Sequence, residues 1–364
     1  NHIYRKKPYL FVKHGRRLYF DPAYPETREF LTQVIKDMVT RYDLDGIHFD
    51  DYFYPNNDFS DESSFALHNR GYKREDKMAW RRENVDLVVK MLRDTIKSVK
   101  PFMKFGISPY AVWRNKAEDP RGSDTRSFGY TNYDHLHADI LKWMEAGWLD
   151  YILPQLYFNI GYPAADFKIL AEWWREYSAG TPVYGGLGTY KLDPASKVEA
   201  WRNADEIKRQ VDMLRGLSGY HGVCYFSAKD MKRNTLGINK VLAELYPNPS
   251  ITPPLRGFET NPPEPPKGAF AHIKSGKVHL QWLGEPLPEG DAPLAECNTD
   301  RAYYYLIYKF KKGEKPDFTR GDAILSLTGE NSVSFEHKGD FDYYISALDR
   351  LYNESPAVKF ATNN

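Results

Sequence analysis

The sequence predicts an α/β protein, a TIM-like (β/α) barrel, followed by a small all-β sandwich. Two changes of pattern along the 364 residues predict this arrangement. Through residues 26–227, short apolar runs alternate with amphipathic segments of helical period, which is typical of parallel strands joined by crossover helices. After residue 268 the apolar residues recur with period two, which indicates antiparallel strands.

Five segments have the apolar character of buried strands, at residues 44–53, 105–110, 150–157, 182–187 and 222–227. Helical periodicity occupies residues 26–42, 83–99, 136–148, 165–177 and 204–217. The predicted strands end in Asp, Tyr, Gln, Asn and Trp, and no Gly-rich phosphate loop follows them, which disfavours a dinucleotide-binding sheet. Because the strand ends of a barrel make up its active-site face, we favour a barrel over an open doubly wound sheet.

Proline divides the chain into two predicted domains. Residues 248–267 are dense in proline, which cannot continue a helix or join a central strand, so they predict a semi-rigid linker. We expect residues 1–247 to form the catalytic barrel and residues 268–364 to form the sandwich. In the latter, a Val-x-Leu-x-Trp strand, a Tyr-rich strand and a Tyr-x-Ile-x-Ala strand follow one another, an order that resembles a fibronectin type III module. Its expected role is structural.

Composition excludes some classes of function. The 50 basic and 49 acidic residues give a net charge of +1 without a basic footprint, so we expect no nucleic-acid partner. No apolar run is long enough to span a bilayer, so no transmembrane segment is expected. The 27 Tyr and 8 Trp suit a cleft for sugar rings, although tyrosines also pack in strands. Cys224 and Cys297 lack metal-ligand spacing, and they indicate either two thiols or one disulfide.

The densest polar cluster at a strand end lies in residues 45–55. Strand alternation places His48, Asp50 and Tyr52 on one face, pointing into the barrel, and Asp51 at the strand tip can turn the same way. Glycosidic cleavage requires two neighbouring carboxyl groups, one to protonate the leaving oxygen and one to attack, activate water or stabilise the cation. We therefore predict Asp50 and Asp51 as catalytic residues. A purely structural role for the acids, or a metal site that includes His48, remains an alternative.

Other strand ends supply candidate binding groups. Gln155 and Tyr157 share a face, where an amide and a phenol can hold sugar hydroxyls or an acetamido group. Trp113 is either a stacking platform or a core anchor. On the helix near residue 83, Arg82 or Asn84 is placed to orient a strand-end carboxylate. The predicted substrate-binding residues are His48, Tyr52, Tyr110, Trp113, Arg114, Gln155, Tyr157, Asn159 and Tyr190. No cofactor or resident metal is expected.

Several stretches in order resemble the glycosyl-hydrolase-like domain of family ten type. They are RLYFDPAYPETREF, YDLDGIHFDDYFYP, WRRENVD, FGISPYAVWRN and DYILPQLYF, and the resemblance covers roughly residues 8–245. The family occurs in bacterial envelope lipoproteins and some peptidoglycan-associated hydrolases. The resemblance implies a TIM-like barrel, export to the cell envelope (periplasm or outer membrane) and hydrolysis of a glycan, which in some members is peptidoglycan strands stripped of peptides.

Two wider similarities concern the roles of the acids. The pattern Asp-Gly-x-His-x-Asp is similar to the Asp-Gly-x-Arg-x-Asp strand of the amylase superfamily, whose last Asp is the nucleophile and corresponds to Asp50. It also resembles the Asp-Gly-x-Asp-x-Asp-x-Glu strand of chitinase-type enzymes, where Tyr52 replaces the acid glutamate. His48 in place of Arg, and Tyr52 in place of Glu, disfavour a plain version of either mechanism.

The resemblance also implies that three strand–helix units precede the segment that opens this sequence. We therefore expect the first barrel strands, and any lipid anchor ahead of them, to lie outside the 364 residues. Two other functions stay open at this point. One is a non-catalytic glycan-binding envelope protein, and the other is a metal-dependent polysaccharide hydrolase or deacetylase that uses Asp50, Asp51 and His48.

Overall fold

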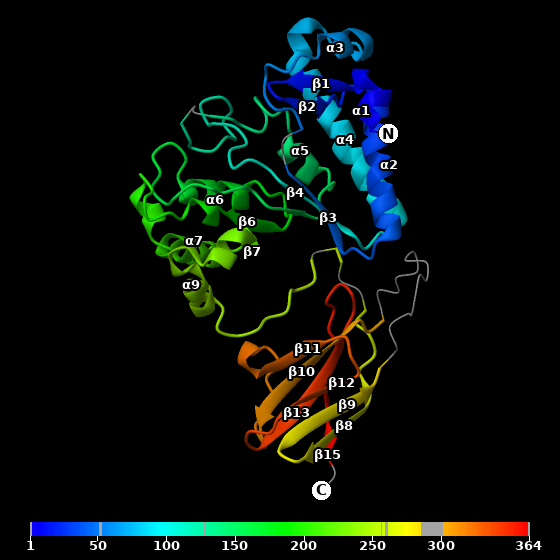
Figure 1. Cartoon of the computed structure of the whole chain (residues 1–364), viewed down its shortest axis with the longest axis vertical. Coiled ribbons are helices and arrows are strands. Elements are labelled where there is room, and N and C mark those ends of the chain that lie inside the picture. The colour runs from blue at the N-terminus through cyan, green and yellow to red at the C-terminus, as the bar shows by residue number, and fades with distance from the viewer. Residues whose placement is uncertain are drawn as a thin grey trace. The chain divides into compact units, whose positions relative to one another are not determined.

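The chain folds as two compact units, residues Asn1–Leu245 and Tyr246–Asn364 (Figure 1). The structure is a computed structural model, and it describes residues 2–50, 53–126, 129–255, 257–258, 261–284 and 301–362. Asp51 and Tyr52, two of the predicted site residues, and Cys297 lie outside the described residues.

A parallel sheet forms the centre of the first unit. Its strands are β3 (Gly46–Asp50), β4 (Lys104–Ser108), β5 (Tyr151–Ile152), β6 (Val183–Leu187) and β7 (Tyr220–Tyr225). They pair in the order β3-β4-β5-β6-β7, and every pair is parallel. The predicted alternation of strands and helices is therefore confirmed. Over the described residues the sheet is open, with β3 and β7 at its two edges, and a closed barrel is not observed.

Strand β5 is much shorter than the predicted segment 150–157 because Pro154 interrupts it. Proline has no N–H to donate to a ladder. The pairing resumes one residue later, where Gln155 bridges to Tyr110 on one side and to Gly186 on the other. The parallel pairing of the sheet thus continues beyond Pro154, through the bridges that Gln155 makes on both sides.

Helices and a hairpin accompany the sheet. The α-helices are α1 (Ile3–Lys6), α2 (Pro25–Arg41), α3 (Glu62–His68), α4 (Lys77–Val99), α5 (Ile140–Glu145), α6 (Phe167–Glu176), α7 (Asp205–Gly216), α8 (Ala228–Arg233) and α9 (Ile238–Leu245). Short 3-10 turns lie at Pro8–Leu10, Arg74–Asp76, Thr189–Lys191, Glu199–Arg202 and Thr235–Gly237. Strands β1 (Phe11–His14) and β2 (Arg17–Phe20) form an antiparallel hairpin.

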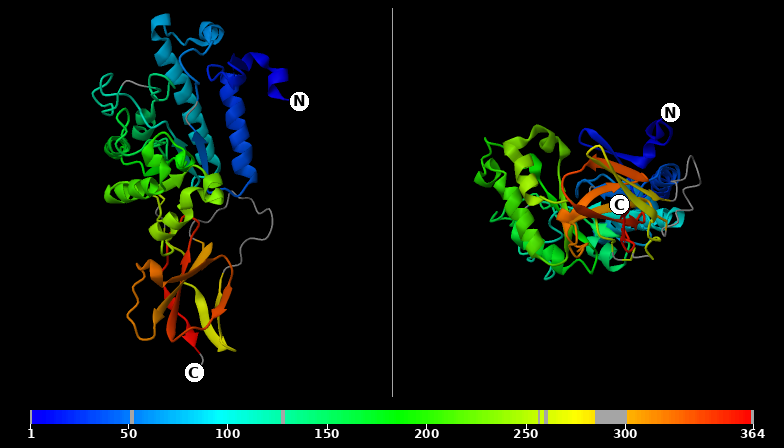
Figure 2. Two further views of the ribbon diagram at one scale, coloured as in Figure 1. Left: turned by 60° about the vertical axis from the view of Figure 1, so that its left-hand side comes forward. Right: turned by 90° about the horizontal axis from the view of Figure 1, so that it is seen from below.

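The long helices begin and end for local reasons. In α2, Pro25 occupies the first turn, where its missing N–H costs nothing, and the helix packs against α4 (Figure 2). Helix α4 starts six residues before the predicted segment 83–99, and its early residue Trp80 is fully buried. Helix α5 is shorter than the predicted segment 136–148, and Asp139 caps it by accepting from the backbone N–H of Lys142.

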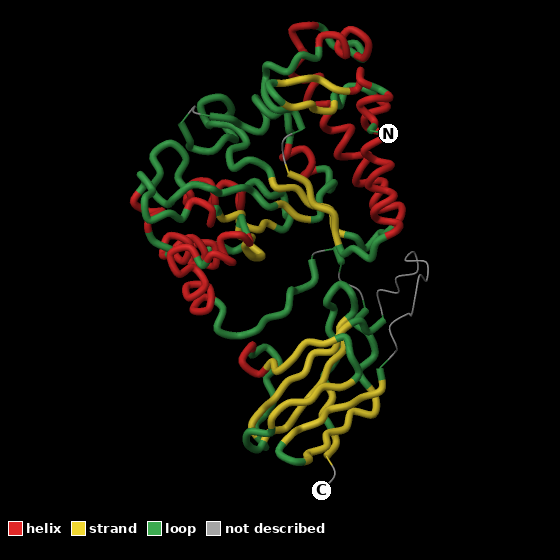
Figure 3. Tube along the Cα trace, viewed as in Figure 1, coloured by secondary structure: helices red, strands yellow, loops and turns green. Residues whose placement is uncertain are grey.

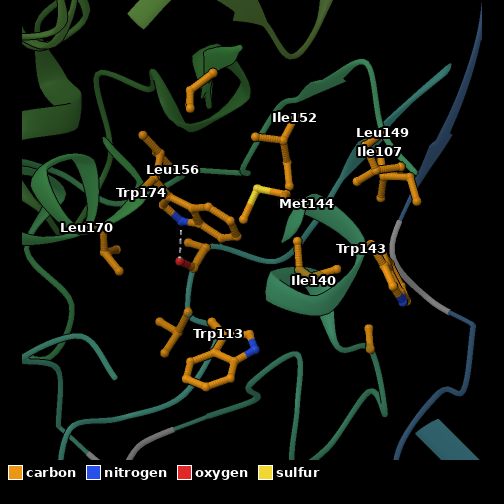
Figure 4. Packing of buried hydrophobic residues seen from close by; sticks show 14 of the residues in the cluster. Ile107, Trp113, Ile140, Trp143, Met144, Leu149, Ile152, Leu156, Leu170 and Trp174 are labelled. Carbon is orange, nitrogen blue, oxygen red and sulfur yellow. Dashed lines mark hydrogen bonds between the residues drawn. The ribbon is translucent and has the colours of Figure 1, made fainter. Parts of the chain in front are cut away.

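One face of the sheet packs into a large apolar core. Alternate strand residues such as Ile47, Ile107 and Ile152 belong to this core together with residues of the helices. Tryptophans from α5 and α6 fill it, and Trp174 donates its indole N–H to the carbonyl of Ala111 at 2.8 Å (Figure 4). Because strand side chains alternate, the residues between these apolar ones lie on the opposite face.

The second unit is a sandwich of two four-stranded sheets (Figure 3). One has the order β11-β10-β13-β14 and the other β12-β9-β8-β15. Their bounds are β8 (Lys267–Lys274), β9 (Lys277–Leu283), β10 (Tyr304–Lys311), β11 (Ile324–Thr328), β12 (Ser332–Glu336), β13 (Phe341–Leu348), β14 (Val358–Lys359) and β15 (Ala361–Thr362). A 3-10 turn lies at Gly321–Ala323. The period-two pattern has its expected meaning, since Val278, Leu280 and Trp282 are buried between the sheets.

The proline-rich segment also contributes to the second unit. Leu255 and Phe258 are buried, and the Phe258 carbonyl accepts from the side-chain amide of Asn353 at 3.2 Å. Ile251 packs against an apolar cluster that includes Leu306 and Tyr308. Part of residues 248–267, the segment predicted as a semi-rigid linker, thus covers the sandwich.

Candidate active site

The open face of the parallel sheet carries polar and aromatic side chains. On β3, His48 and Asp50 are exposed, whereas Ile47 is buried and Phe49 packs against the core. This is the alternation that the sequence predicts. In the ladder, His48 lies opposite Gly106 and Asp50 lies opposite Ser108. Because all five strands are parallel, their carboxyl ends meet at one edge of the sheet, and Asp50 is the last residue of β3.

Both ring nitrogens of His48 are hydrogen bonded. Nδ1 lies 2.9 Å from the hydroxyl of Tyr151 on β5, and Nε2 lies 2.7 Å from Oγ of Ser108 on β4. The rings of His48 and Tyr151 are also stacked, with centroids 5.7 Å apart and planes 17° from parallel. Gly106 leaves the space for this contact, since a Cβ at that residue would lie 2.2 Å from the Tyr151 ring. Residues of three neighbouring strands thus hold the imidazole in place.

Ser108 and Tyr151 cover part of the His48 ring, although the residue as a whole is exposed to solvent. This partial burial lowers the pKa of His48 below its ordinary value of 6.5, and the negative charge of Asp50 opposes the shift. Burial also raises the pKa of Tyr151 to about 12. Near neutral pH the site therefore holds a neutral imidazole and a protonated phenol. One ring nitrogen of His48 then donates a hydrogen bond and the other accepts one.

Asp50 also borders a cavity of about 320 Å³. Most of the lining is apolar and comes from β2, α2, α4 and the end of β3, with Tyr19, Leu31 and Phe53 among the residues. The predicted partner acid Asp51 and the predicted binding residue Tyr52 follow Asp50 directly, outside the described residues. The side chains of Arg82 and Asn84 bind elsewhere: Arg82 lies over the Tyr133 ring, and Asn84 donates to the hydroxyl of Tyr54.

Gln155 and Tyr110 lie together in the middle of the sheet. They form a parallel bridge, and the Gln155 side-chain amide donates to the carbonyl of Ser108 at 3.0 Å. On the other side of Gln155, a Cβ on Gly186 would lie 2.7 Å from the carbonyl oxygen of Pro154, so only glycine fits there. The structure thus brings Gln155 next to the strand that carries Ser108, the partner of His48.

Three predicted binding residues are engaged within the protein. Trp113 lies in the core and is only 1% exposed (Figure 4). Its ring stacks on that of Trp173 with centroids 6.0 Å apart, so it offers no face to a ligand. Of the two roles that the sequence allowed for Trp113, the structure supports the core anchor and not the stacking platform. Arg114 forms ion pairs with Asp119 at 3.1 Å and with Asp134 at 2.9 Å. The side-chain amide of Asn159 donates to the neighbouring carbonyl of Ile160, within its own loop.

Tyr157 and Tyr190 meet at the other edge of the strand ends, together with a residue that the sequence analysis missed. Phe226 directly follows β7, and its ring stacks on Tyr157 with centroids 5.8 Å apart and planes at 23°. Tyr190 contacts both rings edge-on. Lys191 lies beside this trio and donates to the Tyr157 carbonyl. In sequence, an isolated Phe at the end of an apolar strand resembles a core residue, so no signal marked it.

A buried carboxylate supports the loop that follows β5. Glu206 of α7 is fully buried and accepts from the backbone N–H of Ile160 at 2.8 Å and from the amide of Gln210 at 2.9 Å. Gln210 donates in turn to the carbonyl of Phe158 at 3.0 Å. The helix thereby fixes the backbone just after Tyr157. Polar residues inside an amphipathic helix gave no indication of this role.

Among the described residues, none of the helices combines the length and hydrophobicity that crossing a bilayer requires. The same part of the chain, which excludes Asp51, contains no group of three or more His, Cys, Asp or Glu side chains placed to bind a metal ion.

The fold and the site together define an α/β protein whose parallel strands end in a polar and aromatic face. The chain belongs to the family described as Glycosyl hydrolase-like 10, which matches residues 5–203. It is 36% identical over 378 aligned positions to the glycosyl hydrolase YngK of Bacillus subtilis, an alignment that covers all of this chain and 70% of that protein.

A second relative is the glycosyl hydrolase DigH of Escherichia coli K12, which is 37% identical over 221 positions. That alignment covers 58% of this chain and 49% of DigH, so the matched segment spans about half of that relative. Among solved structures, the chitinase ChiA74 of Bacillus thuringiensis aligns with a TM-score of 0.39 and 12% identity. The alignment covers 93% of this chain and 62% of the chitinase.

Proposed function

We propose that this chain hydrolyses O-glycosidic bonds of a bacterial glycan, with Asp50 as one of its two catalytic carboxylates. The observation that carries the proposal is the position of Asp50. It ends β3 on the open face, opposite Ser108 and two residues beyond the hydrogen-bonded His48, in a chain of a glycosyl-hydrolase-like family. Neighbouring strands supply hydroxyl and amide groups that suit sugar hydroxyls.

The mechanism that we propose uses two acids. Asp50 would act as nucleophile, base or stabiliser of the positive charge at the anomeric carbon, and Asp51 is the proposed partner acid. His48 takes a positioning role in this proposal, because both of its ring nitrogens are occupied by Tyr151 and Ser108. It fixes the surface of the sheet beside Asp50 and does not itself bind the sugar.

The finer features of the proposal rest on the resemblance in sequence. We propose peptide-free peptidoglycan strands as the substrate, and the names of YngK and DigH, both glycosyl hydrolases, support glycan hydrolysis in general. We also propose that the five-stranded sheet is part of a (β/α) barrel. Further proposals are a fibronectin type III-like role for the sandwich, and export to the cell envelope with a lipid anchor.

The test is product analysis by mass spectrometry on peptide-free peptidoglycan strands and on chitin oligomers. The parent protein is compared with Asp50→Asn and with Asp45→Asn as a matched control. Asp45 directly precedes the same strand at its other end, so its substitution changes the charge equally but away from the strand ends. We expect cleavage by the parent and by Asp45→Asn, and loss of cleavage in Asp50→Asn.

Other results would point to the other two functions. Retention of strands on the parent protein without any cleavage would favour a glycan-binding protein. Cleavage or deacetylation that disappears with a chelator and returns with added divalent metal would favour the metal-dependent hydrolase. Equal cleavage by the parent and by Asp50→Asn would contradict the role of Asp50.

A further inference from the structure

A buried carboxylate borders a second cavity of the first unit, and the proposed hydrolysis does not use it. Asp21 directly follows β2 and is only 1% exposed. The cavity that it borders has a volume of about 390 Å³, and its lining differs from that of the cavity beside Asp50. The other lining residues lie at positions 9 and 11–13 around β1, at Tyr24 before α2, and in the segment 60–64. A charge in such a position is costly to bury unless an opposite charge or several donors satisfy it.

Two neutral groups bind the Asp21 carboxylate. The backbone N–H of Ala23 donates to it at 3.0 Å, and the Ser64 hydroxyl is its second donor. That hydroxyl has one proton, and its oxygen also lies 3.0 Å from the carbonyl oxygen of Asp61. Within the described residues, no Lys, Arg or His side chain forms an ion pair with Asp21. Because a carboxylate has about four lone-pair sites, part of its capacity to accept hydrogen bonds is unused.

The buried ion pair of Asp61 and Arg81 does not compensate this charge. Arg81 already donates to both carboxylate oxygens of Asp61 and to two backbone carbonyls. Burial raises the pKa of Asp21, its two hydrogen bonds lower it, and repulsion by Asp61 raises it by more than Arg81 lowers it. In the part of the chain that the structure describes, Asp21 is thus a buried negative charge without a cation of its own.

Aromatic rings accompany the carboxylate in the lining of the cavity. The Tyr9 and Tyr24 rings have centroids 5.6 Å apart and meet edge to face at 70°, and Tyr9 is 49% exposed. The face of such a ring attracts a cation, and a carboxylate adds to this attraction. Lys13, which is exposed, also borders the cavity, so its own charge opposes a cation that enters. The combination of a buried carboxylate and aromatic walls suits an ammonium group.

We propose that this cavity binds the primary ammonium group of a small ligand, with the Asp21 carboxylate as its counter-charge and the Tyr9 and Tyr24 rings beside it. An ammonium group has three donors and no acceptor, so it matches the lone pairs that Ala23 and Ser64 leave free. The ligand is an amine, carried either on an amino sugar or on a molecule without a sugar ring. A neutral N-acetylated sugar does not fit, because it brings no charge. The site does not depend on Asp50.

The experiment measures dissociation constants by saturation-transfer difference NMR. The probes are glucosamine, cyclohexylamine and the neutral N-acetylglucosamine, used at about pH 6, where an amine is protonated. In Asp21→Asn the charge is removed, but the oxygen that binds the N–H of Ala23 is kept. Tyr9→Ala removes one ring, Tyr9→Phe keeps it, and Lys13→Met removes the opposing charge. Asp58→Asn is the matched control, because Asp58 is exposed and does not border the cavity.

We expect Asp21→Asn to bind the amines about 10- to 100-fold more weakly, since a charged hydrogen-bond partner is lost. Tyr9→Ala should bind them about 2- to 5-fold more weakly, which is the range for one cation–π contact at an exposed site. Lys13→Met should bind them about 2- to 3-fold more tightly, because a like charge is removed. Tyr9→Phe and Asp58→Asn should stay within about twofold of the parent, and N-acetylglucosamine should not bind.

The two amines identify the source of the ammonium group. Binding of glucosamine alone would support a site for amino sugars, and binding of cyclohexylamine would support a site for amines in general. Equal affinity of the parent and a folded Asp21→Asn for the amines would overturn the proposal, and so would equal affinity of the parent for glucosamine and N-acetylglucosamine. No binding of either amine to the folded parent would overturn it as well. Thermal unfolding shows which variants are folded, and if Asp21→Asn is not, the opposite effects expected for Tyr9→Ala and Lys13→Met decide the outcome.

Discussion

His48 on β3 and Tyr151 on β5 touch across the intervening strand β4. Their side chains are joined by a hydrogen bond of 2.9 Å and by stacked rings. The contact is possible because the residue between them, Gly106, has no side chain. The position of His48, and with it the surroundings of Asp50, thus depends on residues that are distant in sequence and contribute no charge.

Removing the hydroxyl of Tyr151 tests this dependence. In Tyr151→Phe, the imidazole of His48 loses one of its two partners, and its ring is free to choose another tautomer or rotamer. We expect the free energy of unfolding to fall by about 0.5–1.5 kcal/mol. We expect kcat/KM on peptide-free strands to fall by about 3- to 10-fold, and Ser108→Ala should have a similar effect.

Tyr184→Phe is the control for this change. Its ring packs against Tyr151 edge-on at 5.8 Å, so the substitution removes a neighbouring hydroxyl and leaves the bond to His48 intact. Urea unfolding and a pH profile of hydrolysis distinguish the two variants. Equal losses of unfolding free energy and of hydrolysis in Tyr151→Phe and Tyr184→Phe would mean that the hydrogen bond from Tyr151 to His48 has no special role.

Adding one methyl group at Gly106 should disturb the contact between His48 and Tyr151. In Gly106→Ala the new Cβ would lie 2.2–2.5 Å from three atoms of the Tyr151 ring, so the ring must move. Overpacking of this kind costs about 1–3 kcal/mol. The control is Gly216→Ala at the end of α7, where a Cβ would meet no atom within 4 Å. Thermal unfolding should show a lower Tm for the first variant only.

A double variant tests whether the clash with the Tyr151 ring causes the loss of stability in Gly106→Ala. In Tyr151→Leu the aromatic ring is absent, so Gly106→Ala added to it should cost much less than in the parent. Coupling of more than about 0.5 kcal/mol between the two changes is expected for residues in contact. Additive losses would show that the alanine acts through something other than the ring.

A buried ion pair fixes the segment that follows β3. Arg81 of α4 binds Asp61 with two hydrogen bonds of 2.8 and 2.7 Å, and it also donates to the carbonyls of Asn57 and Phe59. Asp61→Asn would leave the buried guanidinium without its counter-charge. We expect a loss of about 3–5 kcal/mol in the free energy of unfolding, measured with urea.

The exposed pair of Asp37 and Arg41 on α2 is the matched control. Its side chains are 49% and 70% exposed, so Asp37→Asn should cost less than about 0.5 kcal/mol. A small effect at both positions would show that Arg81 finds other partners when Asp61 is neutralised.

The sequence predicted the parallel sheet because each strand is a short apolar run between amphipathic helices, and this signal is local. It also predicted the face on which His48 and Asp50 lie, since alternation along one strand determines it. The partners of His48 were not predictable, because Ser108 and Tyr151 follow from strand order and register, which no local pattern encodes. The burial of Trp113 was likewise not predictable from local sequence. An aromatic residue after a strand is buried or exposed according to what packs on it, which here is Trp173.

His137 should make the stability of the first unit depend on pH. It is fully buried and lies 3.3 Å from Nη1 of Arg81 through its Nε2, with Tyr54 packed edge-on against its ring. Burial first, and then the charges of Arg81, Arg82 and His135, lower its pKa to about 3 from an ordinary value of 6.5. The folded state therefore binds fewer protons at His137 than the unfolded state between these two values. Its contribution to stability is complete above pH 6.5 and decreases as the pH falls towards 3.

The variant His137→Asn isolates this contribution. Asparagine does not titrate, and it tolerates the positive φ of 54° at this residue. Relative to the variant, the parent should lose on the order of 1 kcal/mol of unfolding free energy per pH unit below 6.5. Urea unfolding of both proteins at pH 7 and pH 5 measures the difference, since other titrating groups act on both alike. A difference between parent and variant that stays constant with pH would show that His137 is protonated in the folded state, and that Arg81 moves away from it.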